Sequence, residues 1–501
     1  MEGVRRGDDV AFTRGLTIDE ELLDELLARA TSSAAEGLKK ADFTGARFTD
    51  IARFDRTRFV GGATFEGSVF EQPLFMLGCR VEGEAYFSRA VFRSNAFFNH
   101  VRFERATFEL VAFERGADFS GCEFDSISLY GTASHAELSL AGVVVHEDVS
   151  IGPLFSTSVV RLDGAKFEGV AIMRVVAREL TCVATTFTRG SLIEVRRAMM
   201  LLDHAVFREP STIAASVVSF ERSIRDSHEG ELFDEEPLER LGLGERPLLV
   251  SLNLVDASCL SLSGVDLSDC LFRGARNLDR VHIEGARAFG RTPGGLEVAW
   301  SWPPVRWWTR RRVVADERLW RAAMAPPADG AWRESEILGL LSDRSLDFVT
   351  EAVASNPDSI ADLYRSLRKA DEDARNEPAA ADFYYGEMEM RRASVDYPRS
   401  ERALLFLYWL VSGYGLRASR AFVALLLTVL LFAIGFQFWG FAGSATFTEA
   451  LLYSANSTVS LLRAPVRELT TTGGAMDILL RLLGPLFFGL ILVSLRGRIK
   501  R

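Results

Sequence analysis

The sequence predicts a mainly β N-terminal half that coils into a solenoid, followed by an α-helical linker and a C-terminal transmembrane helical hairpin. From Phe43 to Leu129, a large apolar residue returns about every five or six positions, usually with a small residue two positions earlier. This period fits neither an α-helix nor a flat strand, but it fits a chain that turns one corner per repeat. Two long apolar stretches near the C-terminus approach the length that crosses a bilayer.

The recurring apolar side chains form the predicted core of the solenoid. Each coil would bury them against the coil below, because one coil alone cannot bury its apolar face. Alanine stands two positions ahead of many of them, as in Ala41–Phe43 and Ala106–Phe108. The predicted inward residues are Phe43, Phe48, Phe54, Phe59, Phe65, Phe70, Phe75, Val81, Phe87, Phe92, Phe98, Phe103, Phe108, Phe113, Phe119 and Phe124.

The repeated unit resembles that of the pentapeptide-repeat family, which reads small residue, polar residue, Leu or Phe, and then two polar or small residues. Val265–Asp269 and Cys270–Gly274 match this unit closely. The resemblance implies a right-handed quadrilateral parallel β-helix with about twenty residues per coil. Because several spacings are six rather than five, we expect slightly longer coils. The β-helix is predicted over 41–286 in nine or ten coils, with an irregular acidic insertion at about 210–250.

Helical segments are predicted on both sides of the β-helix. Residues 18–38 carry an apolar stripe at helical spacing, so residues 1–40 would form an N-terminal helical cap over the first coil. Residues 336–400 are predicted to form a cytosolic helical hairpin. Its segments Tyr364–Lys369 and Asp382–Arg392 look like the helices that join pentapeptide domains to ion-channel-like membrane pairs in bacterial proteins.

Residues 287–335 form a linker rich in Trp and Arg. Trp307 and Trp308 stand beside the basic run Arg310–Arg312 and are candidate interface residues. Their aromatic side chains could close the open end of the β-helix, contact a membrane surface or stack on nucleic acid. Closure of the open end is the favoured interpretation, because solenoid ends need a cover.

Composition and motifs point away from enzymes and from nucleic-acid binding. The formal net charge is −10, so no overall basic field draws the chain to nucleic acid. The five cysteines are an odd number and are scattered, which predicts free thiols rather than a disulfide framework or a metal site. The one local acid–base cluster, His146–Asp148, is interpreted as a surface turn. We therefore expect no catalytic residue, no metal and no cofactor.

Residues 401–501 are predicted to form a membrane domain. The first spanning helix is expected over about 421–441, which carries no charge, and the second over about 475–495. Positive side chains gather next to the spans on the side of both termini, which predicts a multi-pass protein of the cytoplasmic membrane with both termini in the cytosol.

The second span carries an ionisable pair. Asp477 and Arg481 are four positions apart on one helical face and can pair with each other. Ionisable groups at membrane depth are candidate pore residues, but near the interface a packing or anchoring pair is the favoured interpretation. Gly484 and Gly489 would let helices approach closely, so they are candidate interface residues. These features predict a homo-oligomer.

Between the spans, residues 447–463 resemble the pore helix of two-helix potassium-channel modules. The resemblance makes Thr458, Val459 and Ser460 candidate pore residues. In that family Thr-Val is followed by Gly-Tyr-Gly, whose carbonyls coordinate dehydrated ions. Here Ser460 and Leu461 follow instead, so the resemblance implies an ion-channel-like module without a potassium filter.

The tripeptide Gly413–Gly415 does spell Gly-Tyr-Gly, but it precedes the first span. A filter must follow a pore helix, so we do not interpret this tripeptide as one. It falls instead in an interfacial helix predicted over about 403–416, with Trp409 and Tyr414 at the membrane surface.

Three functions are compatible with these features. The favoured one is a cytosolic protein-interaction scaffold or sensor that is tethered to membrane lipid and binds a protein partner. The alternative is an oligomeric ion-channel-like protein gated by the repeat domain. The third is inhibition of topoisomerase by DNA mimicry, as in soluble pentapeptide-repeat proteins that confer quinolone resistance. It is disfavoured because those proteins are acidic, whereas this solenoid is nearly neutral and precedes membrane helices.

Overall fold

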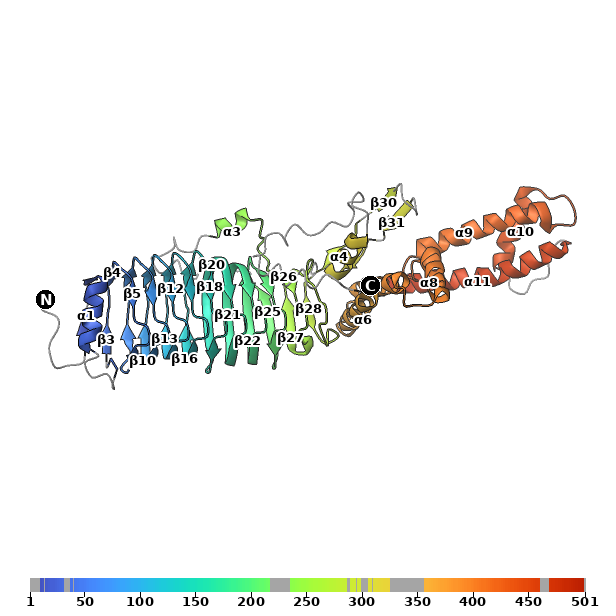
Figure 1. Cartoon of the computed structure of the whole chain (residues 1–501). Coiled ribbons are helices and arrows are strands. Elements are labelled where there is room, and N and C mark those ends of the chain that lie inside the picture. Colours follow the sequence, from blue (N-terminus) through green and yellow to red (C-terminus); the bar gives the residue numbers. More distant parts are fainter. Residues whose placement is uncertain are drawn as a thin grey trace. The chain divides into compact units, whose positions relative to one another are not determined.

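The computed structural model describes most of the chain, which divides into two compact units, Met1–Ser355 and Asn356–Arg501. The first unit contains a coiled parallel β-sheet, and the second consists of helices (Figure 1). The described residues are 10–12, 14–30, 37–38, 40–216, 235–285, 289–293, 295–298, 305–308, 310–324, 356–459 and 468–499.

The parallel sheet is a β-solenoid of about 11 turns. Ala41 pairs with Ala63 of the next coil, 22 residues on, whereas Phe187 pairs with Phe207, 20 residues on. Coils longer than twenty residues, as predicted, therefore occur in the N-terminal part. The strands are β1 Val10–Phe12, β2 Thr17–Ile18, β3 Lys40–Asp42, β4 Arg47–Phe48, β5 Ala52–Arg53, β6 Arg58–Phe59, β7 Ala63–Thr64, β8 Val69–Phe70, β9 Leu74–Phe75, β10 Arg80–Tyr86, β11 Val91–Phe92, β12 Ala96–Phe97, β13 Arg102–Thr107, β14 Ala112–Phe113, β15 Ala117–Asp118, β16 Glu123–Ser128, β17 Ala133–Ser134, β18 Leu138–Ser139, β19 Val144–Val145, β20 Val149–Arg161, β21 Lys166–Thr181, β22 Thr186–Arg196, β23 Met199–Leu201, β24 Val206–Phe207, β25 Ser211–Ala215, β26 Leu248–Ser251, β27 Leu260–Ser263 and β28 His282–Glu284.

The solenoid begins earlier than the sequence predicted. Strand β1 pairs in parallel with β3, and β2 pairs with β4, so coiling starts before residue 41. This accounts for about 11 turns in place of the predicted nine or ten. Helix α1, Glu20–Ala30, follows β2 and packs against β1 and β5, with Leu23 and Leu26 buried beneath it.

The predicted Phe ladder lines the interior in columns that run from coil to coil. In the first column, the ring centroid of Phe65 lies 5.0 Å from that of Phe43 and 4.8 Å from that of Phe87. These distances match the spacing of neighbouring strands, so each ring continues the stack of the coil before it. The other columns contain Phe48, Phe70, Phe92 and Phe113, then Phe54, Phe98 and Phe119, and then Phe59, Phe103 and Phe124.

Phe75 is the one predicted core aromatic that the structure places outside. Leu74 and Met76 are fully buried, and Phe75 between them points outward because alternate residues of a strand face opposite sides. Its ring stacks on that of Phe97 at 5.0 Å, and the Arg53 guanidinium lies 5.2 Å from its centroid. The prediction was wrong here, because it assigned Phe75 to the interior in place of its apolar neighbours Leu74 and Met76.

Small polar side chains tie neighbouring coils together at the corners. The Ser68 hydroxyl donates to the Phe43 carbonyl at 2.6 Å, and the Thr132 hydroxyl donates to the Phe108 carbonyl at 2.6 Å. The Cys122 thiol makes the equivalent bond and is fully buried. Burial raises the pKa of Cys122 to about 12, so this thiol stays protonated and packs like a small apolar side chain.

The C-terminal coils are covered by helix α4, Ala315–Met324. The Asp316 carboxylate accepts a hydrogen bond from the Phe272 backbone N–H at 3.1 Å, and Leu319 packs into the apolar core. Beneath the helix, Arg311 donates to the fully buried Glu317 at 2.6 Å. Two short antiparallel pairs precede it in the sequence, β29 Gly290–Arg291 with β32 Arg312–Val313 and β30 Gly295–Val298 with β31 Val305–Trp308.

The acidic insertion lies between β25 and β26, within the predicted range of about 210–250, and its C-terminal part packs on the solenoid. The coil continues through β25 to Ala215 and resumes at β26, while residues 217–234 lie outside the described part. Helix α3, Glu236–Arg240, then packs Leu238 into the core. The nearly buried Arg196 and Arg197 both donate to Glu235, at 3.1 and 2.5 Å.

The second unit is a chain of helices. Helices α6 and α7 form a hairpin, in which Gly386 makes room for the buried Tyr364 ring: a Cβ at Gly386 would lie 2.7 Å from it. Figure 1 shows α9 and α11 running side by side with α10 near one end and α8 near the other. The helices are α6 Pro357–Asp373, α7 Glu377–Ala393, α8 Arg399–Ser412, α9 Ala418–Gly435 with the π-helical turn η4 Phe436–Gly440, α10 Phe447–Val459 and α11 Thr471–Ile499.

Candidate functional site

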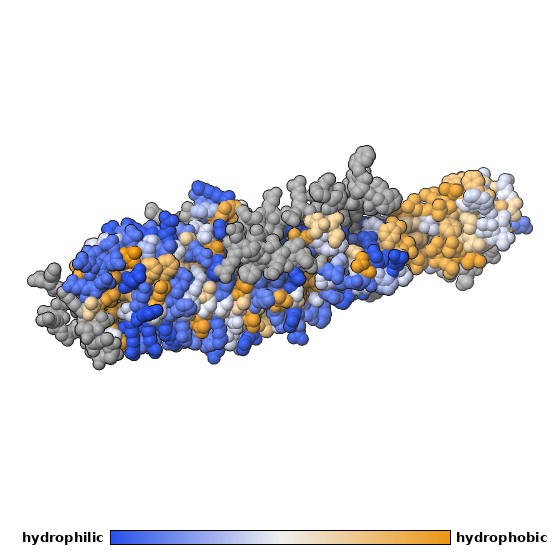
Figure 2. Space-filling view, viewed as in Figure 1, coloured by the Kyte–Doolittle hydropathy of each residue, from blue (hydrophilic) through white to orange (hydrophobic). Residues whose placement is uncertain are grey.

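Two helices of the second unit are long and apolar enough to cross a membrane, Ala418–Gly440 and Thr471–Leu495. The predicted spans fall on these helices. Only 33% and 22% of the two hydrophobic windows are buried within the chain. Figure 2 shows orange apolar surface gathered over them. The exposed large side chains are Phe422, Val423, Leu426, Leu427, Leu430, Leu431, Ile434, Phe438, Trp439, Ile478, Leu479, Leu482, Leu486, Phe488, Leu492, Val493 and Leu495.

Helix α10 fills the space between the two long helices. Phe436, Ala450 and Leu480 form a fully buried core among α10, α11 and η4. The Thr458 hydroxyl donates to the Ser454 carbonyl at 2.8 Å, so it is satisfied within its own helix. This predicted pore residue is therefore buried in the hairpin.

The other two candidates of this segment differ from Thr458. Val459 is 71% exposed at the end of α10. Ser460 lies outside the described residues.

The predicted ion pair in the second span is present. The Asp477 carboxylate lies 2.9 Å from the Arg481 guanidinium, and their side chains are only 8% and 17% exposed. The pair therefore faces the interior of the hairpin. One polar atom on each of Asp477, Arg481 and Tyr453 is buried without a geometrically good hydrogen bond to any described residue. Burial within one chain removes the argument that this pair needs a neighbouring subunit to cover it.

Of the two candidate interface glycines, one is used inside the chain. A Cβ at Gly484 would lie 2.1 Å from the Thr458 carbonyl oxygen, so this glycine lets α11 meet the end of α10. Gly484 is therefore not available to a second subunit, although the sequence had suggested it as an interface residue. A Cβ at Gly489 would meet nothing within 4 Å, so Gly489 remains a predicted contact.

The candidate interface residues of the linker lie in a short hairpin. Trp307 and Trp308 belong to β31 and pair through their backbones with Leu296 and Gly295 of β30. Their side chains lie outside the described part. Helix α4 packs Ala315 and Leu319 into the apolar cluster of the β-helix, and the closing role predicted for the two tryptophans stays a prediction.

The Gly413–Gly415 turn joins α7, α8, α9 and α11. Tyr414 is 1% exposed, and its hydroxyl donates to the Glu389 carboxylate at 3.1 Å. The Ser494 hydroxyl near the end of α11 donates to the Gly415 carbonyl at 2.8 Å. Trp409 donates from its indole to the Tyr385 hydroxyl at 3.0 Å. Trp409 and Tyr414 therefore pack within the helical unit, and their place at the membrane surface stays a prediction.

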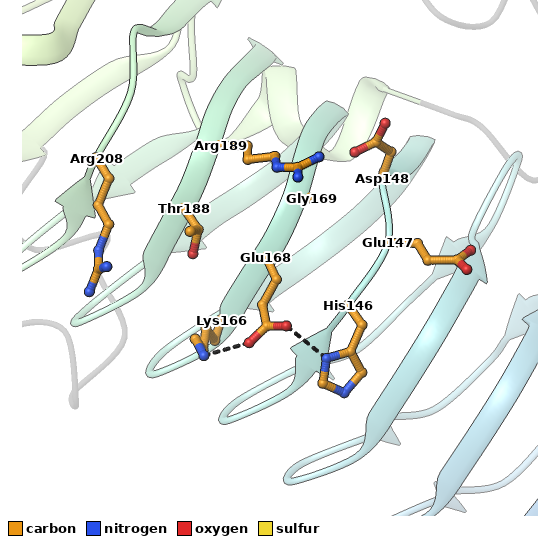
Figure 3. Close-up of a pocket in the computed structure, with 9 residues that line it drawn as sticks. All are labelled: His146, Glu147, Asp148, Lys166, Glu168, Gly169, Thr188, Arg189 and Arg208. Atoms are coloured by element: carbon orange, nitrogen blue, oxygen red, sulfur yellow. Dashed lines mark hydrogen bonds and ion pairs between the residues drawn. The ribbon is translucent and has the colours of Figure 1, made fainter.

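A groove of about 820 Å³ opens on one side of the β-helix, lined by the nine residues labelled in Figure 3. His146 lies between two carboxylates, with Nδ1 2.8 Å from Glu168 and Nε2 2.9 Å from Glu123. Lys166 lies 2.5 Å from the other oxygen of Glu168. Hydrogen bonds to Glu168 and Glu123 raise the pKa of His146, and those from Lys166 and His146 lower the pKa of Glu168 to about 2.

These shifts predict a pH-dependent contribution to stability. Because its folded pKa is raised, His146 stabilises the fold fully below its unfolded value of 6.5, and this contribution is lost as pH rises through the folded pKa. We expect the melting temperature of the natural chain to exceed that of His146→Gln more at about pH 5.5 than at about pH 8.5. Thermal unfolding of both chains at the two pH values tests this, and an equal gap at both would contradict it.

Sequence reasoning found the His146–Asp148 turn but not the groove. Lys166, Thr188 and Arg208 come from the next coils, and only the register brings them to the same side of the solenoid as His146. Among the residues that the structure describes, no group of three His, Cys, Asp or Glu side chains could hold a metal ion.

Residues 38–76 and 77–123 match the family model described as pentapeptide repeats, nine copies. The chain carries pentapeptide repeats. The two matched segments contain the most regular Phe columns, and the pentapeptide-repeat β-helix is typically a structural or interaction domain. No curated protein and no solved structure matches the chain.

Proposed function

We propose that this protein is a membrane-anchored scaffold or sensor, in which the pentapeptide-repeat β-helix binds a protein partner and the α9–α11 hairpin holds it at the cytoplasmic membrane. One observation carries the proposal: both long helices leave most of their apolar surface uncovered. The apolar helices of a soluble core would be covered by protein, and exposed apolar areas of this size mark contact surfaces. The length of both helices fits the hydrocarbon thickness of a bilayer.

The surface of α8 supports a position at the membrane interface. One face of this helix packs Leu405, Tyr408 and Trp409 toward α7 and the Tyr414 turn. The other face exposes large apolar side chains to the outside of the unit. They are Leu404, Phe406, Leu407 and Leu410. A helix with this exposed face would lie along the headgroup region, with the two spans leaving it into the bilayer.

The distribution of positive charge gives the proposed orientation. Basic side chains near short spans are retained on the cytoplasmic side, so both termini and the whole β-helix would lie in the cytosol. Arg463 and Arg467 are the basic residues of the connecting segment. The basic residues on the other side are Arg417, Arg420, Arg496, Arg498, Lys500 and Arg501.

A homo-oligomer remains part of the proposal, with a revised basis. Asp477, Arg481 and Gly484 are used within one hairpin, so they no longer argue for a second subunit. Gly489 opens to the outside and would allow another helix to approach.

An oligomeric channel is the less favoured function. A conducting pathway needs carbonyls, charged rings or a gating constriction along its wall. Within 421–440 and 475–495, every exposed residue that the structure describes is apolar, aromatic, Gly or Pro. We expect purified protein in planar lipid bilayers to give no conductance above that of protein-free bilayers. Reproducible unitary currents, lost in the Val459→Asp variant, would overturn the tether in favour of the channel.

A further inference from the structure

One side of the β-helix carries a row of residues held in register by successive coils. Val145, Phe167, Phe187 and Phe207 pair as inward neighbours, so the residues that follow them also stack from coil to coil. This outward row reads His146, Glu168, Thr188 and Arg208, and it forms the floor of the groove in Figure 3.

In the first half of the row, His146 and Glu168 are paired with charged side chains of the same and neighbouring coils. Arg102 pairs with Glu123 at 2.5 Å, Glu123 with His146 at 2.9 Å, His146 with Glu168 at 2.8 Å, and Lys166 with Glu168 at 2.5 Å. These groups form a continuous chain of opposite charges. The carboxylate of Glu168 is thus held between the Lys166 ammonium and the His146 imidazole, so it is already paired within the groove.

The chain of pairs ends where the row reaches Thr188. The Thr188 hydroxyl oxygen is buried and has no hydrogen-bond partner within the part of the chain that the structure describes. Among the described residues, neither Arg208 nor Arg189 has a side-chain hydrogen bond or ion pair. Figure 3 shows the Thr188 hydroxyl and the Arg208 guanidinium extending toward the same side of the groove, while Lys166 is paired with Glu168. The unpaired carboxylate of Glu147 lies at the opposite end.

We propose that Thr188 and Arg208 form a binding site for an oxyanion, a phosphate or carboxylate group, with Lys166 at its edge. A guanidinium can donate two parallel hydrogen bonds to such a group, and the Thr188 hydroxyl would donate a third. A buried hydroxyl without a hydrogen bond lowers the stability of the fold. A ligand that accepts a hydrogen bond from it replaces the hydrogen bond to water that was lost on folding. This site lies on the β-helix alone and does not depend on the membrane hairpin.

The test is anion binding by the full-length protein purified in mild detergent. Binding of a fluorescein-labelled phosphoserine peptide is followed by anisotropy at constant ionic strength, and inorganic phosphate is used as competitor against chloride. Thr188→Val keeps the shape of the side chain, and Arg208→Gln removes the cation. We expect each to weaken peptide binding about tenfold. Displacement of the labelled peptide by inorganic phosphate would show that the site recognises the anion itself. Displacement by unlabelled phosphoserine peptide, but not by inorganic phosphate, would show that the site recognises the phosphate only when it is carried by a peptide.

Arg93→Gln is the matched control. Arg93 is also an exposed cation of the β-helix, but it is already paired with Glu71 at 2.9 Å. Its loss should leave binding unchanged if the site is specific. Equal weakening by Arg93→Gln, or no binding of the peptide to the natural chain, would overturn the proposal. Melting temperatures of the variants separate loss of the site from loss of the fold.

Discussion

Phe108→Ala is expected to lower the unfolding free energy of the β-helix by about 3–5 kcal/mol. Phe108 is fully buried, and its ring centroid lies 4.6 Å from that of Phe87 in the same column. It also meets Phe98 and Phe119 edge-on at 5.5 and 5.0 Å. Because strand spacing holds these rings in place, they cannot move in to fill the cavity. Phe108→Asp should be worse, since it buries a carboxylate without a partner.

Urea titration of the purified chain, followed by far-UV circular dichroism, measures the cost. Arg105→Gln is the control, because Arg105 lies on the outside of the β-helix. Its side chain is 62% exposed and lies 3.2 Å from the exposed Glu84. We expect it to change the unfolding free energy by less than about 0.5 kcal/mol. Equal loss of stability in Phe108→Ala and Arg105→Gln would show that the inward set is assigned wrongly.

Arg481→Leu is expected to destabilise the membrane hairpin by about 3–5 kcal/mol. The change leaves the Asp477 carboxylate buried with its ion-pair partner gone. The double variant Asp477→Leu with Arg481→Leu should recover most of this loss, because an apolar pair carries no desolvation cost. Thermal unfolding of all the variants in detergent completes a double-mutant cycle. If the single and double variants have the same melting temperature, below that of the natural chain, the loss of stability does not come from leaving the Asp477 carboxylate unpaired.

The Phe columns could be predicted from the sequence because one physical requirement repeats. Each coil must bury an apolar side chain at the same place as its neighbour, so Phe43, Phe65, Phe87 and Phe108 recur at nearly constant spacing. Phe75 broke the prediction because Leu74, Phe75 and Met76 are all apolar. Only the backbone decides which two of three such neighbours face inward.

Contacts between distant segments could not be predicted. The sequence pairs Asp477 with Arg481 through helical spacing, but it does not reveal that α10 lies against the same face of α11. Gly484 was correctly seen as a place of close approach, while its partner, Thr458, belongs to the same chain. The groove on the β-helix was likewise hidden, because His146 and Arg208 are brought together only by coil register.

The most direct test of the membrane-tethered β-helix is a pair of alkaline phosphatase fusions expressed in bacterial cells. The enzyme is active only after export from the cytosol. One fusion follows Gly443, in the segment between the two spans, and the other follows Arg501. The account predicts activity after Gly443 and none after Arg501, since the hairpin would cross the membrane twice and return both termini to the cytosol. Activity after Arg501, or no activity at either position with both fusions stably expressed, would contradict it.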